Sequence, residues 1–363
     1  MTQSDEILTY NLFINPKDLQ DLRSDIWCDD PVRGVLNFNK KKYDIDIVYR
    51  GAHTRKLKKK SYHINFYKPK FFMGSKELHL NAEFRDPSIM RNKLSLDFFS
   101  DIGVLSPKSQ HVFVNINGKQ EGVYLQLESV DERFLQKRSC PEGTIFYAVD
   151  GDANFSLVSD LDKEVKKSLS LGYELKYGSN EAMGYLENFI YKVNTLSHDD
   201  FEKEIDTFLN VPNYLKWLAG VVFTQNYDGF VHNYALYRNN QTGQFEVIPW
   251  DYDGTWGRDV NGKIMESNYV RIEGFNTLTA RLLAKPVYRM QYRDLVKSIL
   301  NNKFTVENMQ PKIEKLHHQL RPFVLKDPYK KEDINQFDME PEFILQFINK
   351  RRSYIYDRLD KLL

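Results

Sequence analysis

The sequence lacks most features that mark secreted or membrane-spanning proteins. Its 363 residues include only 2 cysteines, Cys28 and Cys140, which lie far apart along the chain. No apolar run reaches the about 18 residues that a membrane span needs, and no signal-like N-terminus is present. We therefore expect no membrane partner, and a reducing cytosol as the place of synthesis.

An excess of charge of one sign is also missing. Lys and Arg number 51 and Asp and Glu number 50, so the formal net charge is +1. No global field would recruit DNA, RNA or an anionic membrane, and any electrostatic recognition must be local. We therefore expect no nucleic-acid partner. Internal repeats, low-complexity tails and Pro-rich linkers are absent too, whereas the aromatic content of 14% indicates a well-packed globular protein.

The first 128 residues are predicted to be rich in strands. Partial alternation marks strands at 43–49 and 61–66, and Asn117-Gly118 is typical of the type I′ turn of a hairpin. Helices are expected near 16–28 and 87–101, because each range opens at a capping residue followed by proline.

The remaining residues, 129–363, are predicted to be mostly helical. A polar stretch from Asp150 to Asn180 is the best candidate for a loop or lid. The range 226–254 holds a short hairpin with strands near 234–238 and 244–250. A length of 363 residues fits two coupled lobes. We therefore predict an α+β fold with a β-rich N-lobe, 1–128, and an α-rich C-lobe, 129–363.

The hairpin region carries the most informative pattern in the chain. Asp228 follows a predicted helix, Asn233 comes five residues later, and Asp251 follows the apolar strand that ends the hairpin. The spacing Asp, four residues, Asn is that of the kinase catalytic loop. In phosphoryl transfer one carboxylate accepts a hydroxyl proton, while an amide and a second carboxylate hold Mg²⁺. The pattern therefore indicates that chemistry.

Each of these residues also has an ordinary structural interpretation. Asp228 could cap a loop, and Asn233 could be a turn amide. Asp253 lies two positions after Asp251, so in an extended chain only one of the two faces a cleft. We choose Asp251, because it directly follows the apolar strand. Two carboxylates about 4 Å apart repel by roughly 4 kcal/mol at an effective dielectric of about 20, so convergence of Asp228 and Asp251 would call for a cation.

Lys60 is a candidate contact for phosphate. By the strand period of two it shares the apolar face of Tyr62 and Ile64, and a buried lysine needs an anionic partner, either a structural carboxylate or a phosphate. Arg50 and Arg55 lie nearby and could extend an anion-binding edge, although a charge run on a strand edge can equally be solubilising.

A glycine-rich phosphate loop is missing from the N-terminal third. The segment from Tyr49 to Thr54 could replace it. Tyr147 and Trp250 present flat aromatic surfaces that could stack on adenine, although aromatic residues in apolar runs are usually part of the core.

Several short motifs together resemble the CotH family of atypical protein kinases. They extend over nearly the whole chain and comprise Tyr49-Arg-Gly51 with Lys58-Lys-Lys-Ser-Tyr62, Leu80-Asn-Ala82 with Met90-Arg-Asn-Lys-Leu94, Gly122-Val-Tyr-Leu125 with Glu128-Ser-Val-Asp131, Asn226-Tyr-Asp-Gly229 with His232-Asn233, and Pro249-Trp-Asp-Tyr-Asp253.

The resemblance implies a divergent, reduced, two-lobed protein-kinase-like fold. It also implies an enzyme that uses ATP with Mg²⁺ or Mn²⁺ to phosphorylate serines of other spore coat proteins. Such a protein would be made in the mother-cell cytoplasm and located in the spore coat. The implied site residues are catalytic Asp228, metal ligands Asp251 and Asn233, phosphate-contacting Lys60, and Tyr147 with Trp250 as an adenine sandwich.

Two other classes of function remain open on the sequence. One is a catalytically inactive, kinase-shaped scaffold for coat assembly. The other is a metal-dependent hydrolase, such as a nuclease, built on Asp228, Asp251 and Asp253. The neutral net charge speaks against a nuclease, because nucleic-acid affinity needs several cationic contacts to phosphate.

Overall fold

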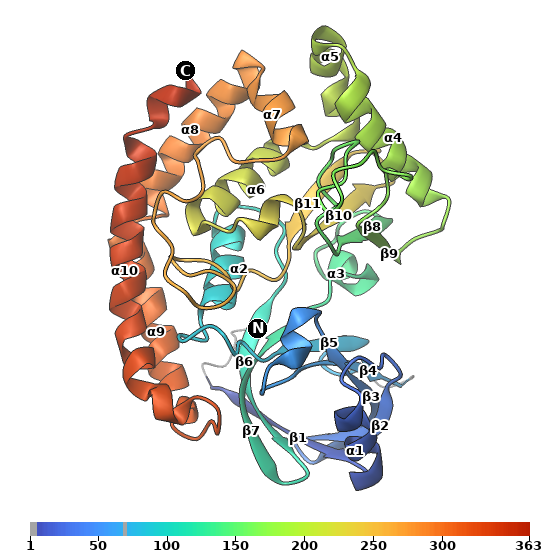
Figure 1. Ribbon diagram of the computed structural model, residues 1–363, viewed down its shortest axis with the longest axis vertical. Coiled ribbons are helices and arrows are strands. Elements are labelled where there is room, and N and C mark those ends of the chain that lie inside the picture. The colour runs from blue at the N-terminus through green and yellow to red at the C-terminus, as the bar shows by residue number, and fades with distance from the viewer. Residues whose placement is uncertain (1–5, 68–70) are drawn as a thin grey trace. The chain divides into compact units, whose positions relative to one another are not determined.

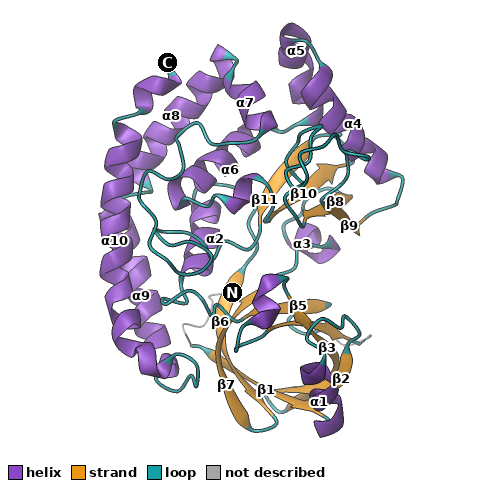
Figure 2. Ribbon diagram, in the orientation of Figure 1, coloured by secondary structure: helices purple, strands orange, loops and turns teal. Residues whose placement is uncertain are grey.

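The computed structural model describes residues 6–67 and 71–363, and they form an α+β protein of two compact units. Unit 1 combines 1–93, 108–129 and 311–343, and unit 2 combines 94–107, 130–310 and 344–363. The predicted α+β class is confirmed (Figure 2). The crossing at 129/130 lies one residue from the predicted lobe boundary, but the chain also crosses at 93/94, 107/108, 310/311 and 343/344.

Unit 1 is built on a closed barrel with the strand order β1-β2-β3-β4-β5-β7-β6 (Figure 1). The strands are β1 Leu8–Ile14, β2 Val32–Phe38, β3 Lys41–Arg50, β4 Ser61–Phe66, β5 Glu77–Asn81, β6 Ser109–Ile116 and β7 Lys119–Leu127. Neighbouring strands are antiparallel except β1 and β6, which pair in parallel and close the barrel. Alternate residues of the strands, such as Tyr62, Ile64 and Phe66, fill the core.

Two local signals in unit 1 are confirmed. Asn15 caps α1, Pro16–Ser24, by accepting a hydrogen bond from the backbone N–H of Lys17 at 2.9 Å, and Pro16 opens the helix. The helix ends earlier than the predicted residue 28. The Asn117-Gly118 turn joins β6 to β7 with φ of 50° and 78°, the positive values that a type I′ turn requires.

The second predicted helix of this part starts later than expected. Helix α2 spans Arg91–Asp101, not 87–101. The carboxylate of Asp86 accepts hydrogen bonds from the backbone N–H groups of Ser88 and Arg91. Residues 87–90 therefore form a turn, and Asp86 binds the first N–H of the helix that follows this turn. Buried Arg91 forms ion pairs of 2.6 Å with both Asp86 and Glu340. This network favours the turn over an early helix start.

Within unit 1, a buried ion pair joins the barrel to the segment that follows helix α9 (Val306–Val324). Lys59 Nζ lies 2.9 Å from Asp327 Oδ2, and neither side chain is exposed to solvent. Lys59 also donates to the backbone carbonyl of Val123, and its ammonium lies 4.6 Å from the centroid of the Tyr124 ring. Burial lowers the pKa of Lys59, and the neighbouring Asp327 carboxylate opposes that change.

Gly122 is needed where the Asp327 carboxylate meets β7. Its φ is +95°, and a Cβ at this position would lie 2.1 Å from Asp327 Oδ2. Left-handed backbone strain alone would lower the free energy of unfolding of Gly122→Ala by about 1–2 kcal/mol. The clash with Asp327 should add to that loss. Gly118→Ala is the matched control, because its φ is +78° but no atom lies within 4 Å of the added Cβ. Urea denaturation should give G122A a clearly lower free energy of unfolding than G118A. Equal losses of unfolding free energy in the two variants would contradict the steric argument.

Unit 2 contains helices around a sheet with the strand order β11-β10-β8-β9 (Figure 2). Its strands are β8 Gly143–Ala148, β9 Tyr173–Tyr177, β10 Tyr234–Asn239 and β11 Phe245–Pro249. Its helices are α3 Glu132–Lys137, α4 Ala182–Thr195, α5 His198–Phe208, α6 Val211–Thr224, α7 Thr277–Leu283 and α8 Pro286–Asn302. It also holds most of α2, the first residues of α9 and the C-terminal part of α10 Ile334–Tyr356. Helix α6 is buried along almost its whole length and packs against α8 and β11.

The polar stretch from Asp150 to Asn180 is more ordered than a simple surface loop. It includes β9, which pairs with β8, and Phe155 is fully buried against Phe189 and Tyr234. Lys166, buried in the same stretch, donates to Asn154 Oδ1 at 2.7 Å. The polar composition of the stretch gave no sign of these buried residues.

Within the described residues, no helix is both long and apolar enough to cross a bilayer.

Candidate functional site

Asp228 lies where α6 ends and the chain turns. Gln225 ends the helix in the left-handed region with φ of 62°, and Asn226 Oδ1 accepts a hydrogen bond from Gly229 N–H at 3.1 Å. Asp228 begins a short 3-10 turn, Asp228–Phe230, and its carbonyl accepts the N–H groups of Val231 and His232. The turn holds Asp228 half-buried and next in space to the residues that lead into β10.

Gly229 allows this turn to pack tightly. A Cβ on Gly229 would lie 2.8 Å from the hydroxyl oxygen of Tyr252, which is fully buried. Tyr252 stands between Asp251 and Asp253 in the chain, and burial raises the pKa of its hydroxyl. The contact therefore links the Asp228 turn to the segment that carries Asp251.

The β10–β11 hairpin brings Asn233 and Asp251 to the same end of the sheet. Tyr234 pairs with Pro249, and one step further Trp250 N–H donates to the Asn233 carbonyl at 3.0 Å. Asp251 follows Trp250 directly. Asn233 and Asp251 both have φ of 60°, a strained conformation for residues other than glycine that is frequent at functional sites.

The donor set at this end of the hairpin suits a hard divalent cation. Asp228, Asn233 and Asp251 are half-buried and offer carboxylate and amide oxygens, the ligands that Mg²⁺ and Mn²⁺ prefer. Asp253 has a structural role, since its Oδ1 accepts the N–H of Gly254 at 2.8 Å. The choice of Asp251 over Asp253 as a metal ligand stays a prediction.

Tyr147 and Trp250 do not have the predicted sandwich arrangement. Their ring centroids lie only 5.2 Å apart with the planes tilted by 36°, which is direct ring contact. The two residues come from β8 and the end of β11, on either side of β10, and the Tyr147 hydroxyl accepts the Val130 N–H at 2.9 Å. In this arrangement the rings contact each other and leave no gap for a base between them, and a role of Tyr147 and Trp250 in stacking on adenine stays a prediction.

Lys60, Arg50 and Arg55 belong to unit 1. Lys60 keeps the phase of Tyr62, with its Nζ 5.9 Å from the centroid of the Tyr49 ring, but β4 begins only at Ser61 and Lys60 is half-buried. Its ammonium donates to the Arg55 carbonyl, and partial burial lowers its pKa. Lys60 therefore keeps the predicted inward phase but is only half-buried, and the lysine without exposure is its neighbour Lys59.

The arginines near Lys60 have structural contacts. Arg55 forms a 2.6 Å ion pair with Asp29 and donates to the Gly51 carbonyl at 2.7 Å, which holds the turn after β3. Arg50 donates to Asn81 Oδ1 on β5. A role of Lys60, Arg50 and Arg55 in phosphate binding stays a prediction.

Sequence reasoning missed two arrangements in unit 1. The Lys59–Asp327 pair joins residues 268 positions apart, and no local pattern marks it. His63, Glu77 and His79 gather on β4 and β5 with ligand atoms within 4.8 Å of one another. The outward phase of His63 was visible in the alternation of β4, but its pairing with β5 was not.

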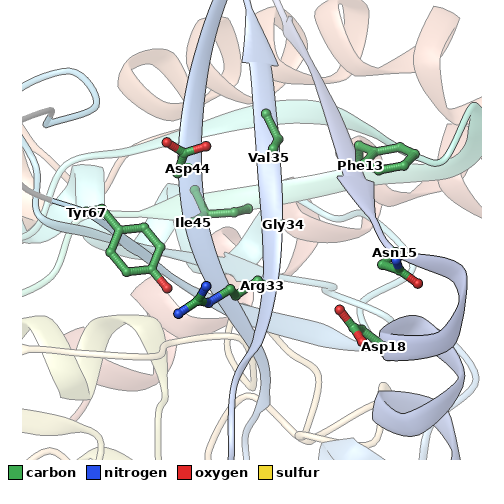
Figure 3. A pocket seen from close by; sticks show the side chains of 9 residues that line it. All are labelled: Phe13, Asn15, Asp18, Arg33, Gly34, Val35, Asp44, Ile45 and Tyr67. Atoms are coloured by element: carbon green, nitrogen blue, oxygen red, sulfur yellow. The ribbon is translucent and has the colours of Figure 1, made fainter.

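A separate cavity of about 470 Å³ lies on the outside of the barrel. Figure 3 shows the side chains that line it, with Arg33 extending toward the hydroxyl of Tyr67. The other lining residues are Phe13, Asn15, Asp18, Gly34, Val35, Asp44 and Ile45. None of these described residues is among the predicted site residues.

Comparison with known proteins places the motifs in a family. Residues 47–355 match the family described as CotH kinase protein. The chain is 58% identical over 362 residues to inner spore coat protein H of Bacillus subtilis (strain 168), covering 100% of both chains. It is 29% identical over 307 residues to the inner spore coat protein H-like protein of the same organism, covering 85% of this chain and 88% of that one.

A solved structure was also matched, the crystal structure of a Helicobacter pylori proinflammatory kinase, CtkA. It covers 96% of this chain and 94% of that chain at 10% identity, with a TM-score of 0.31, too distant to support an argument. The family match spans most of the sequence, and the 58% identical relative spans all of it. The chain therefore belongs to the CotH family.

Proposed function

We propose that this protein is an atypical protein kinase that transfers the γ-phosphoryl group of ATP to serine hydroxyls of spore coat proteins. The observation that supports the proposal is the hairpin register, which sets Asn233 opposite Trp250, one residue before Asp251, together with the tight approach of Gly229 in the Asp228 turn to Tyr252, the residue after Asp251. Family membership supports it, since the family is described as a kinase family.

In the proposed reaction the serine Oγ forms a bond to the γ-phosphorus while the bond from phosphorus to the β–γ bridging oxygen breaks. ADP leaves with that oxygen, and the serine proton passes to the Asp228 carboxylate. Asp228 also orients the hydroxyl, and alignment of this kind is a major part of catalysis for a loose transition state. A Mg²⁺ or Mn²⁺ ion held by Asp251 and Asn233 would neutralise charge on the phosphate oxygens.

The remaining predicted site residues have proposed roles on the nucleotide. Lys60, with Arg50 and Arg55 nearby, would contact phosphate, and the outer face of Trp250 or Tyr147 would stack on adenine. These roles need a kinase-like two-lobed arrangement, which we propose as well.

The proposed location and partners come from the relatives. Both Bacillus subtilis relatives carry the name of an inner spore coat protein or of a protein like it. We propose that this protein is likewise made in the mother cell, acts on other coat proteins and resides in the spore coat.

Incubating the purified chain with a spore coat protein, Mg²⁺ and ATP labelled at the γ-phosphate tests the proposal. Label in the coat protein at serine, located by mass spectrometry, would support it. A protein that neither transfers nor releases phosphate would be a scaffold, and release of phosphate without protein labelling would indicate a hydrolase. Either of those results would overturn the proposal.

Asp251→Asn should weaken the Mg²⁺-dependent part of ATP binding by more than about 10-fold, because changes even outside a metal's ligand shell typically cost about 10- to 100-fold. Asparagine is preferred to alanine because it tolerates the φ of 60° at this position. Calorimetry with and without Mg²⁺ measures the effect. Asp253→Asn is the matched control, because its side-chain oxygen can still accept the Gly254 N–H. A D251N protein with wild-type Mg²⁺ dependence would remove Asp251 from the site.

A further inference from the structure

A cluster of two imidazoles and a carboxylate lies on the outer face of the barrel. His63 on β4 pairs directly with His79 on β5, and Glu77 lies two residues before His79 on the same face of the strand. Their neighbours Tyr62, Ile64, Leu78 and Leu80 fill the barrel core. Strand alternation therefore directs the His63, Glu77 and His79 side chains to one side of the sheet.

The two His–Glu distances are close to the spacing of ligands around a small metal ion, and one ligand atom from each of the three residues lies within 4.8 Å of the others. His63 Nε2 lies 3.0 Å from Glu77 Oε2, and His79 Nε2 lies 3.8 Å from Glu77 Oε1. The imidazole rings stack with centroids 4.9 Å apart and planes 15° apart, so they approach the same carboxylate side by side. Ligand atoms about 2.0–2.1 Å from a tetrahedral zinc ion are about 3.3 Å from one another.

The surroundings of the cluster hold its carboxylate in place. Ser129, just after β7, donates its hydroxyl to Glu77 Oε1. Side-chain exposure is 26% for His63, 11% for Glu77 and 8% for His79, so the cluster is sheltered yet open at His63. Buried metal ligands typically have such second contacts that orient them. A simple His63–Glu77 ion pair would explain one contact, but not the second imidazole at the same carboxylate.

We propose that His63, Glu77 and His79 bind one divalent ion of the zinc class, with water as the fourth ligand. Two imidazoles and a carboxylate favour Zn²⁺ and similar transition metals, whereas the oxygen ligands at Asp228, Asn233 and Asp251 favour Mg²⁺ or Mn²⁺. The ion would tie β4 to β5 and stabilise the barrel. This proposal concerns unit 1 alone and does not depend on kinase activity.

Titration of the full chain with ZnCl₂ tests the site, after chelator treatment and without nucleotide. Calorimetry should show one Zn²⁺ per chain, and Co²⁺ should give the visible absorption bands of a tetrahedral site. His63→Gln should weaken Zn²⁺ binding by more than about 100-fold, beyond the loss typical of a change outside the ligand shell. Glutamine at this half-exposed position can still contact Glu77, so the barrel should keep its fold.

His317→Gln is the matched control. His317 Nε2 lies 3.0 Å from Asp338 Oδ1, the same contact as His63 with Glu77, and it belongs to no described cluster of three metal-ligand residues. H317Q should bind Zn²⁺ as the wild type does, and so should D251N. Glu77→Gln supplies a second test should H63Q prove unstable by circular dichroism, and it too should lose Zn²⁺ binding. The proposal is wrong if the wild type binds no Zn²⁺, or if binding survives in H63Q and E77Q.

Discussion

Asp228→Asn is expected to lower the rate of phosphoryl transfer to serine by about 10²–10⁴-fold, the usual contribution of a general base. Asparagine has nearly the same size as aspartate. The turn should stay intact, because it is the backbone carbonyl of Asp228 that accepts the hydrogen bonds from the N–H groups of Val231 and His232. It cannot accept the serine proton. Nucleotide affinity should therefore change little while transfer is lost.

Single-turnover labelling of a coat protein measures the transfer rate, and calorimetry measures ATP binding in the same D228N preparation. Asp259→Asn is a suitable control, because Asp259 Oδ1 accepts the N–H groups of Asn261 and Lys263 and an asparagine oxygen can do the same. D259N should label the substrate at the wild-type rate. Wild-type transfer by D228N would exclude Asp228 as the base, while loss of ATP binding in D228N would point to a role in binding.

Lys59→Met is expected to lower the free energy of unfolding by about 3–5 kcal/mol, because it leaves a buried charge on Asp327 without its cation. The side chains of Lys59 and Asp327 have no solvent exposure, so water cannot replace the lost partner. The Val123 and Tyr329 N–H groups still contact the carboxylate at 2.8 Å, but neutral donors do not balance a full charge. Against a typical total of about 5–15 kcal/mol, the loss is large.

Urea denaturation followed by circular dichroism measures this effect. Lys60→Met is the matched control, because Lys60 is half-buried and its ammonium donates to a backbone carbonyl rather than pairing with a buried carboxylate among the described residues, so the change should cost far less. Adding Asp327→Asn to Lys59→Met should recover part of the lost stability, because the second change removes the uncompensated charge. Equal stability of K59M and K60M would refute the assigned importance of the buried pair.

Features set by neighbouring residues were predictable. The Asn15 cap with Pro16, the Asn117-Gly118 turn and the hairpin at 234–249 all follow from preferences that act over a few positions. The order of Asp228, Asn233 and Asp251 also suggested their chemistry. Each of these depends on local geometry or residue type, which a chain carries before it folds.

Features set by distant residues were missed or displaced. Strand period placed burial at Lys60, but β4 starts at Ser61, and the barrel buries Lys59 against Asp327. Helix α2 starts at Arg91 because Asp86 and Glu340 bind that side chain. The polar composition of 150–180 hid β9 and buried Phe155, whose partners lie on α4 and β10.

The amino-acid order alone was enough to indicate the α+β class, the main local turns and the kinds of chemical group that the protein offers. Folding determined which of those groups meet: Asn233 beside Trp250, His63 beside His79, and Lys59 beside Asp327, 268 residues away. Hydrogen bonding and backbone preference act between neighbours, whereas burial and charge pairing depend on contacts that form only when distant segments pack.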